Sequence, residues 1–357
     1  MKLNAIPQDI RQRVKRGTVI PAMPLALTRD RTFDERHQCA LIRYYLAAGV
    51  GGIAAGVHST QFQIRAPEFG LFEPVLGLVS GAIDACCGPQ AAVLKVAGVC
   101  GKTEQALKEA RFAAENGYHA GLLSLAAFAN EDIPALIDHC KRVAAEMPIF
   151  GFYLQPSVGG RILPYAFWRR FVEIENVLAI KIAPFNRYQT FDVVRAVCDA
   201  GRENDIALYT GNDDNIVVDL LTEYRIQTDG GEKAVRIVGG LLGHWSVWTK
   251  KAVDLLAQIH DLTENKAPLP PQMLSLAQEI TDANAAFFDA ANNYSGCIPG
   301  IHEVLRRQGL FRGTWCLDEK EVLSPGQIDQ INRVYACYPH LNDDAFIKEN
   351  LEKWLSG

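Results

Sequence analysis

A lysine and a tyrosine lie in two neighbouring apolar runs of this sequence, and their chemistry is specific. The run VLAIKIA contains Lys181, and the run PIFGFYL contains Tyr153. A lysine inside a buried strand must reach the rim or lose its charge, because burial disfavours the ammonium form. A neutral amine can attack a carbonyl carbon to form an imine, and a nearby phenol can move the protons. The pair predicts Schiff-base chemistry if both side chains point inward; otherwise Lys181 faces a helix and Tyr153 is core.

These two runs belong to a series of eight short apolar, β-rich segments that would position them. The segments begin at Val19, Gly51, Val93, Ala120, Pro148, Val177, Ile206 and Val235. Their centres lie 27 to 42 residues apart, which leaves room for a strand, a helix and two loops. Strands that alternate with helices pair in parallel, and eight units over about 240 residues predict an α/β fold, the (β/α)8 TIM barrel. A doubly wound open sheet is the alternative, but the first run lacks the glycine-rich turn typical of that fold.

The β-rich runs end after the eighth unit, at the charged and proline-rich stretch ENKAPLPP. The sequence therefore predicts a leader over 1–18, the barrel over 19–262 and a helical C-terminal domain over 263–357. Asp-Gly-Gly between two β-rich runs, within 227–233, predicts a hairpin before the eighth strand. Helical spacing is expected over 34–48, 103–116, 133–146, 191–200, 244–260, 273–291, 298–308, 325–338 and 343–355.

Composition excludes several classes of partner. A formal charge of -5, with no long basic cluster, lacks the electrostatic footprint of a nucleic-acid-binding protein. The nine cysteines include no C-x-x-C pair, which is typical of reduced thiols in a cytoplasmic protein. No apolar run approaches the roughly 18 residues of a membrane span, and the first residues lack the apolar segment of a signal peptide. We expect a cytoplasmic protein whose partners are small molecules, with neither nucleic acid nor membrane.

Five segments resemble the dihydrodipicolinate synthase / N-acetylneuraminate lyase family of Schiff-base-forming lyases. They are PAMPLALTRDRTFD, AAGVGGIAAG, FYLQPSVGGRILP, NVLAIKIAPFN and TGNDD. The resemblance implies that Lys181 forms an imine with a 2-oxo acid, usually pyruvate, and that Tyr153 is the acid/base. It also implies a helical C-terminal domain and a homo-oligomer, usually a tetramer built as a dimer of dimers. No metal ion or organic cofactor is expected.

The sequence departs from the family pattern at the sites that hold substrate. Where the family reads Gly-Thr-Thr-Gly-Glu, this chain reads Gly56-Val57-His58-Ser59-Thr60. Ser59, Thr60 or backbone amides are the expected ligands of the carboxylate, and a protonated His58 would also suit an anion; otherwise His58 is a hydrogen-bonded wall residue. Thr210 and Gly240, in the seventh and eighth strand segments, complete the expected substrate-binding set. The paired tyrosines of the synthases are replaced by Ala126-Ala127, and their substrate arginine is replaced by Val158. These changes argue against lysine biosynthesis and predict a different aldehyde or acceptor.

The sequence thus predicts a class I lyase or aldolase, with Lys181 as nucleophile and Tyr153 as proton shuttle. Three alternatives remain open. The same imine chemistry could dehydrate a sugar acid, or the barrel could bind a 2-oxo acid without turning it over. A metal-dependent class II aldolase or hydrolase would use His58 with Asp213, Asp214 or His244.

Overall fold

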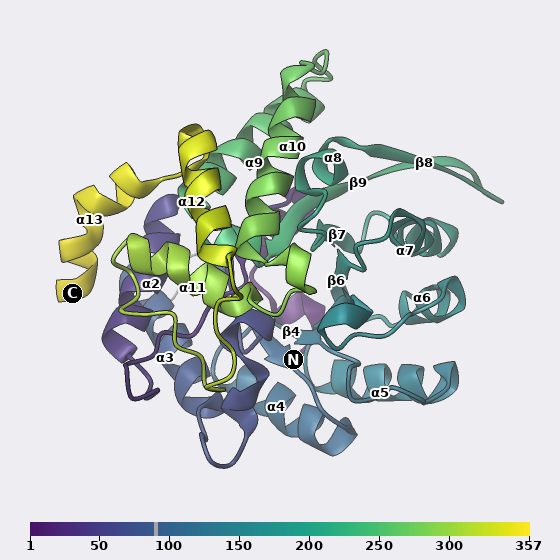
Figure 1. Cartoon of the computed structure of the whole chain (residues 1–357). Coiled ribbons are helices and arrows are strands. Elements are labelled where there is room, and N and C mark those ends of the chain that lie inside the picture. Colours follow the sequence, from purple (N-terminus) through teal and green to yellow (C-terminus); the bar gives the residue numbers. More distant parts are fainter. Residues whose placement is uncertain (89–91) are drawn as a thin grey trace. The chain divides into compact units, whose positions relative to one another are not determined.

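The computed structural model describes residues 1–88 and 92–357, and the chain divides into two compact units (Figure 1). Unit one comprises Met1–Thr18 and Leu94–Leu241, and unit two comprises Val19–Val93 and Leu242–Gly357. These units do not follow the predicted boundaries of 1–18, 19–262 and 263–357, which stay predictions. The stretch expected to be a leader is helical, and it belongs to unit one.

Unit one is built on a sheet of parallel strands. Their spatial order is β3 (Leu94–Val99), β4 (Ala120–Leu123), β5 (Ile149–Leu154), β6 (Val177–Ala183), β7 (Ala207–Thr210) and β9 (Gly231–Leu242). Neighbouring strands pair in parallel throughout, for example Gly121 with Ile149 and Ile182 with Thr210. The residues of β3 to β7 are buried without exception, which is typical of a parallel sheet covered on both faces.

Helices connect these strands and stand in a row beside them, as α4 to α7 do in Figure 1. The helices of unit one are α1 (Gln8–Arg16), α4 (Thr103–Glu115), α5 (Ile133–Glu146), α6 (Tyr165–Phe171), α7 (Arg187–Asp199) and α8 (Ile216–Leu221). Local signals set their starts: Asp132 accepts a hydrogen bond from the Ala135 amide, and Asn186 accepts one from the Gln189 amide. These caps satisfy amides that the first helical turn leaves without a partner.

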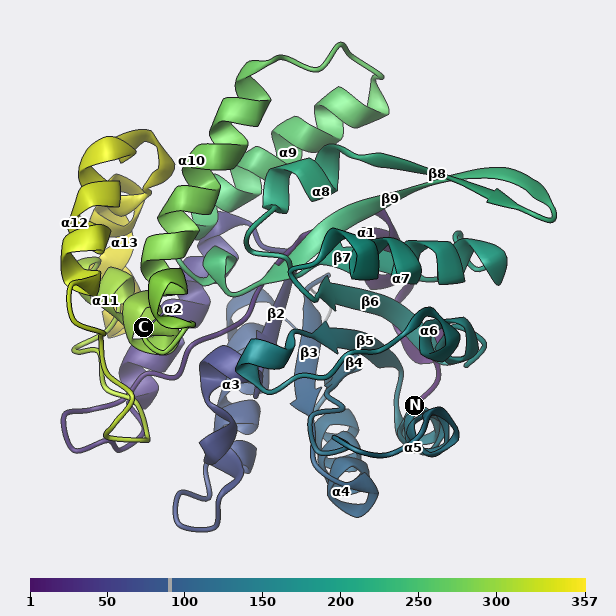
Figure 2. The same ribbon diagram turned by 45° about the vertical axis from the view of Figure 1, so that its right-hand side comes forward.

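A long hairpin of β8 (Glu223–Thr228) and β9 extends beyond the other strands of unit one (Figure 2). The two strands are antiparallel, and Thr228 pairs with Gly231 beside the turn. The hairpin predicted from Asp-Gly-Gly is therefore confirmed. Gly231 has φ of +103°, a conformation open to glycine at no steric cost.

Unit two holds the first two strands and most of the C-terminal helices. Its elements are β1 (Val19–Pro21), α2 (Glu35–Ala48), β2 (Gly52–Ala55), α3 (Phe72–Cys87), α9 (Thr249–Glu264), α10 (Gln272–Phe287), α11 (Cys297–Arg307), α12 (Gln327–Cys337) and α13 (Asp344–Ser356). The last helix packs on α2, where the ring of Tyr44 lies 5.6 Å from that of Trp354. The Tyr44 hydroxyl also donates to Asp343 at 2.6 Å, so a buried carboxylate anchors the start of α13.

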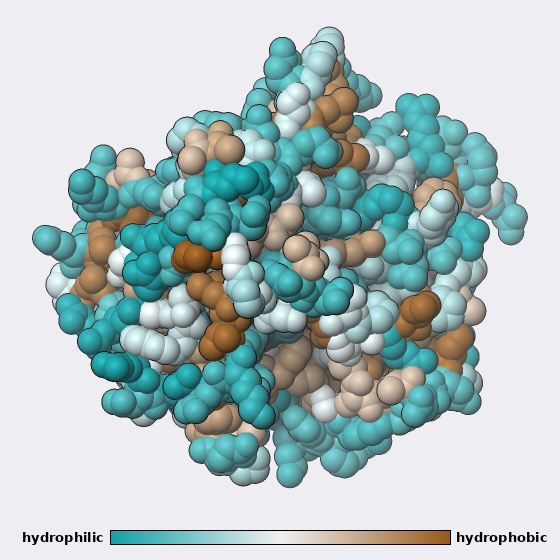
Figure 3. All heavy atoms as spheres, viewed as in Figure 1, coloured by the Kyte–Doolittle hydropathy of each residue, from teal (hydrophilic) through white to brown (hydrophobic). Residues whose placement is uncertain are grey.

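Along the chain, each parallel strand is followed by a helix, from β1 and α2 to β9 and α9. This is the alternation that the eight apolar runs predict. In the described part of the chain, no helix is long and apolar enough to cross a membrane. On the face drawn in Figure 3, hydrophobic residues lie in small groups among hydrophilic ones.

Candidate active site

Lys181 lies in the middle of β6, and only 8% of its surface is exposed. The strand register pairs it with Phe152 on β5 and with Tyr209 on β7. Register partners in a parallel sheet point to the same side, so these three side chains share one face, which we name the lysine face. The Lys181 Nζ lies 4.6 Å from the centroid of the Phe152 ring, within range of a cation–π interaction.

Gly211, directly after β7, leaves the space that the lysine side chain fills. A Cβ atom at position 211 would lie 2.6 Å from Lys181 Cε and 2.7 Å from Ala183 Cβ. The turn after β7 therefore touches the lysine along its aliphatic chain. Its backbone is tied to the neighbouring strand, since the Gly211 amide donates to the Ile182 carbonyl at 2.7 Å.

Burial lowers the pKa of Lys181 to about 8, and the carboxylate of Asp213 opposes this change. Desolvation is the larger cause, because the ammonium loses water that the apolar strand cannot replace. Asp213 is itself only 5% exposed. At pH 7 about a tenth of an amine with this pKa is neutral, against less than a thousandth of an ordinary lysine. The site therefore holds a usable nucleophile at neutral pH.

Tyr153 lies on the opposite face of β5. Its register partner on β6 is Ile182, its ring lies 5.4 Å from that of Trp168 on α6, and its hydroxyl accepts a hydrogen bond from the Leu163 amide at 3.1 Å. Burial raises its pKa. The structure thus does not bring Tyr153 to Lys181: Phe152 takes the position beside the amine. A register irregularity between Ile149 and Phe150 precedes this arrangement.

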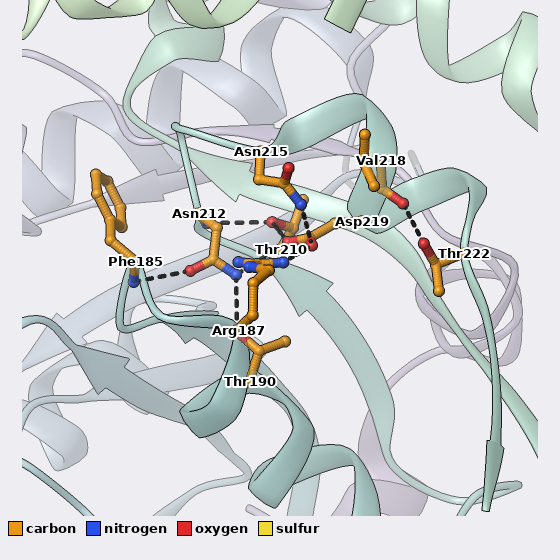
Figure 4. Close-up of polar contacts among 9 residues, drawn as sticks. All are labelled: Phe185, Arg187, Thr190, Thr210, Asn212, Asn215, Val218, Asp219 and Thr222. Carbon is orange, nitrogen blue, oxygen red and sulfur yellow. Dashed lines mark hydrogen bonds and ion pairs between the residues drawn. The ribbon is translucent and has the colours of Figure 1, made fainter. Parts of the chain in front are cut away.

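A buried carboxylate, Asp219 on α8, organises the turns after β6 and β7 (Figure 4). It accepts hydrogen bonds from Thr210 Oγ1 at 2.7 Å, Asn212 Nδ2 at 2.9 Å and Asn215 Nδ2 at 3.0 Å, and it pairs with Arg187. Asn212 Oδ1 in turn accepts from the Phe185 amide at 3.0 Å. One acidic side chain therefore fixes both turns that flank the lysine.

Two residues of unit one that the sequence predicts as substrate ligands, Thr210 and Gly240, make hydrogen bonds within the protein. Thr210 donates its hydroxyl proton to Asp219, and its face is that of Ile182, opposite the lysine face. The Gly240 amide donates to the Thr18 carbonyl at 3.2 Å. The structure brings neither of these two polar groups to Lys181. Their role in binding stays a prediction.

The three predicted ligands of unit two lie in a 3-10 turn, His58–Thr60. Ser59 Oγ donates to the Ala22 carbonyl at 2.5 Å, and Thr60 Oγ1 donates to the Met23 carbonyl at 2.6 Å. Both residues are buried, and the Thr60 hydroxyl also accepts from the Val57 amide. Both hydroxyl protons are thus committed to backbone carbonyls of unit two. The His58 ring is half-buried and lies 6.0 Å from that of Phe62.

The turn after β5 holds Val158, which stands where the resemblance places a substrate arginine. Val158 stands in the short turn Pro156–Val158, and Arg161, three residues later, donates to the carbonyls of Phe128 and Glu131. This arginine therefore ties the segments after β4 and β5 together. The NH1 group of Arg161 is thus engaged by backbone.

The class II alternative finds no ligand set in the described residues, among which no group of three or more His, Cys, Asp or Glu side chains could hold a metal ion. His244 lies in unit two, stacks on Phe287 at 5.8 Å and is near Asn284. Burial lowers its pKa to about 4. Asp213 and Asp214 follow β7 in unit one, and burial raises the pKa of Asp214.

The sequence did not indicate the roles of Asp213 beside the lysine or of Asp219 beneath the turn. The sequence suggests Asp213 only as a metal ligand, although TGNDD places it directly after a strand. Asp219 sits among apolar residues of α8, where no motif marks it. An acidic residue inside an otherwise apolar helix was the one signal available.

Comparison with known proteins places these observations in a family. Residues 15–223 match the model of the Dihydrodipicolinate synthetase family. The chain belongs to this family. A 4-hydroxy-tetrahydrodipicolinate synthase from Campylobacter concisus is 31% identical over 164 residues, which cover 45% of this chain and 50% of that enzyme. The chain thus matches about half the length of this relative.

Solved structures of the family share the fold. A prophage protein of the dihydrodipicolinic acid synthase family from E. coli K12, in complex with pyruvate, superposes with a TM-score of 0.71 at 17% identity, over 91% of this chain and 98% of that one. N-acetylneuraminate lyase from Fusobacterium nucleatum gives 0.69 at 14% identity, over 90% and 99%. The predicted fold class, a (β/α)8 barrel with a C-terminal helical domain, is confirmed.

Proposed function

We propose that this chain is a class I lyase that forms a Schiff base between Lys181 and a 2-oxo acid such as pyruvate. The observation that carries the proposal is the buried amine on β6, whose pKa is lowered to about 8. Family membership supports it, and so does the pyruvate bound to the E. coli prophage relative. The imine would act as electron sink while a C–C bond beside it breaks or forms.

Borohydride trapping tests the nucleophile directly. Incubation with pyruvate and borohydride should reduce the imine to a stable secondary amine, and peptide mapping should find the added mass on Lys181. The variant K181M should lose the adduct completely. Lys95 on β3 is a matched control, because it is also a buried strand lysine of unit one. An adduct on Lys95 and Lys181 alike would show nonspecific modification, and an unmodified Lys181 would remove the proposal.

The substrate and the direction of the reaction require a second experiment. Offering a panel of 2-oxo acids during trapping would show which acid loads the lysine. Offering aldol adducts and sugar acids would then separate an aldolase, which releases an aldehyde, from a dehydratase, which releases water. We keep the C–C lyase as the leading proposal, because the named relatives include a synthase and a lyase.

A second candidate function is a barrel that binds a 2-oxo acid and turns nothing over. The observation that favours it is the position of Tyr153, on the face of β5 opposite Lys181. Such a protein would still give the borohydride adduct, but it would release no carbonyl product from any aldol adduct. The role of Tyr153 as proton shuttle stays a prediction that Y153F can test.

The cytoplasmic location and the homo-oligomer also remain proposals. A homo-oligomer would show as a sedimentation mass that is a multiple of 39.4 kDa, the mass of one chain. A monomer at micromolar concentration would contradict it.

A further inference from the structure

A cavity of about 250 Å³ lies within unit two, between α9, α10 and two short 3-10 turns, His244–Ser246 and Pro339–Leu341. All the residues that line it belong to unit two, so it shares no residue with the lysine face. We name it the tryptophan cavity, after two of the apolar side chains that form its walls: Trp245, Val247, Trp248, Ala252, Leu255, Leu276, Ile280 and Leu341. A cavity of about 150 Å³ already holds a benzene ring. The space therefore suits one aromatic ring with a short substituent.

The aromatic wall of the tryptophan cavity is held in a strained conformation. Trp248 has φ of 52° and ψ of 34°, in the left-handed region that a residue with a large side chain seldom adopts. Its ring packs edge-on against Phe287 at 4.8 Å and Tyr335 at 5.3 Å, and only 3% of the residue is exposed. Such strain persists only where the surroundings enforce it, and it gathers at ligand sites and switches. The wall is therefore preformed, which lowers the cost of binding a ligand.

An uncharged interior and a charged mouth divide the cavity. His244 lies in the buried wall, and burial lowers its pKa to about 4, so its ring is neutral at pH 7. The exposed side chains of Lys251, Asp254 and Gln258 also line the cavity. They follow one another along α9 at spacings of three and four residues, which places them on one face of the helix. A ligand would thus meet apolar atoms inside and charges at the entrance.

The charges at the mouth leave one lysine in excess. Asp254 pairs with Lys250, and His340, which lines the cavity from the other side, lies 2.8 Å from the Glu279 carboxylate. Within residues 1–88 and 92–357, Lys251 forms no ion pair. The mouth therefore carries a positive charge that an anionic group can neutralise.

We propose that the tryptophan cavity binds a small aromatic carboxylate, whose ring lies against Trp248 and Leu255 and whose carboxylate meets the Lys251 ammonium. Burial of the ring supplies most of the affinity, because the free energy of transfer grows with the apolar area removed from water. The lysine supplies selectivity, since a neutral amide gains little from it and an ammonium group is repelled. Binding here does not depend on imine formation at Lys181, so the site goes beyond the proposed function.

Three ligands of nearly one shape test this assignment: phenylacetate, its neutral amide phenylacetamide, and the cation 2-phenylethylamine. Their dissociation constants for the full-length protein are measured by ligand-observed NMR. We expect phenylacetate to bind with a Kd of about 1 mM or below, which is ordinary for a ligand of about ten heavy atoms. It should bind about three- to fivefold more tightly than the amide, as one exposed ion pair provides, and the amine should bind most weakly.

Two variants separate the ring contact from the charge contact. A252L fills the cavity with three further carbon atoms while keeping a good helix former on α9, so it should weaken phenylacetate and its amide alike by about tenfold or more. K251M keeps an aliphatic chain at the mouth and should abolish the preference for the carboxylate, with the amide unchanged. K348M, which removes an exposed lysine of α13, is the matched control and should leave all three constants unchanged.

Several outcomes would overturn the proposal. Phenylacetate that does not bind at about 10 mM would do so, and binding that A252L leaves unchanged would show that the ligand lies elsewhere. Equal affinity for the three ligands, or a carboxylate preference that survives in K251M, would remove the role of Lys251. If A252L lacks a urea unfolding transition, K251M still decides, because it changes selectivity without filling the cavity. The borohydride adduct on Lys181 is measured separately, so failure here and failure of the proposed function are distinguishable.

Discussion

Two polar regions of this molecule use the same kinds of side chain for different ends. In unit one, Asp219 gathers two amides and a hydroxyl, and the neighbouring turn leaves Asp213 with its charge acting on Lys181. In unit two, the Ser59 and Thr60 hydroxyls donate to the carbonyls of Ala22 and Met23. The first region holds charged side chains near the Lys181 amine. In the second region, side-chain hydroxyls bind the backbone of a neighbouring segment. A side chain at a motif position is therefore no guide to function until its hydrogen bonds are known.

The largest effect is expected from removing the carboxylate that holds the first region. D219A leaves the buried Thr210 hydroxyl without its acceptor and removes one of the two acceptors of the Asn212 amide group, which keeps Thr190, and the lost network should cost about 3–5 kcal/mol. Urea unfolding measures this as a lower midpoint. The control D205A removes an exposed ion pair with Arg202 and should cost less than about 1 kcal/mol. Equal midpoints for the two variants would show that the Asp219 network does not hold the turns.

A smaller effect is expected in the second region, where S59A sharpens the contrast. Loss of the hydroxyl bond to Ala22 should destabilise the fold by about 1 kcal/mol. Because the hydroxyl proton is already donated to backbone, the pyruvate concentration that half-saturates trapping should change by less than about threefold. A rise of tenfold or more in that concentration would show that Ser59 binds substrate, and the two regions would then be alike.

The pH dependence of trapping gives the smallest effect. The neutral amine is the nucleophile, so the rate should rise with pH through about 8, the pKa of Lys181, and then level off. Asp213 favours the charged ammonium, so D213N should move this midpoint to lower pH and speed trapping at pH 7 by about two- to fivefold. A midpoint that stays in place in D213N would show that the two charges do not interact.

Much of the fold could be predicted because it depends on local patterns. The apolar runs gave the strands, Asp-Gly-Gly gave the turn of the β8–β9 hairpin, and helical spacing gave α2, α4 and α5 closely. Helix α3 was missed, and it contains Gly77, Gly81 and a proline, which all have poor helix propensity. The leader likewise contains a helix, α1, that was not expected.

The site was harder to predict, because it depends on which face of a strand each residue occupies. Lys181 was recognised from burial alone, which an apolar run reveals. Tyr153, on the neighbouring apolar run, was expected beside Lys181 if both side chains pointed inward, but the β5–β6 register sets Phe152 there instead. A shift of one residue exchanges the two faces of a strand, and a sequence pattern does not fix the register between two strands. Asp219 acts through partners on three elements, a relation that only the folded chain contains.

The β8–β9 hairpin offers a site at which other groups can be inserted. Its tip, Asp229 and Gly230, is exposed and connects Thr228 of β8 to Gly231 of β9. Exposed loop tips made of small or polar residues tolerate insertions well. The exposed charges of Glu223 and Arg225 along β8 also disfavour strand-to-strand aggregation. A fluorophore or affinity tag inserted at this tip would leave the lysine face untouched, so the hairpin is the natural place to attach this protein to a surface or a reporter.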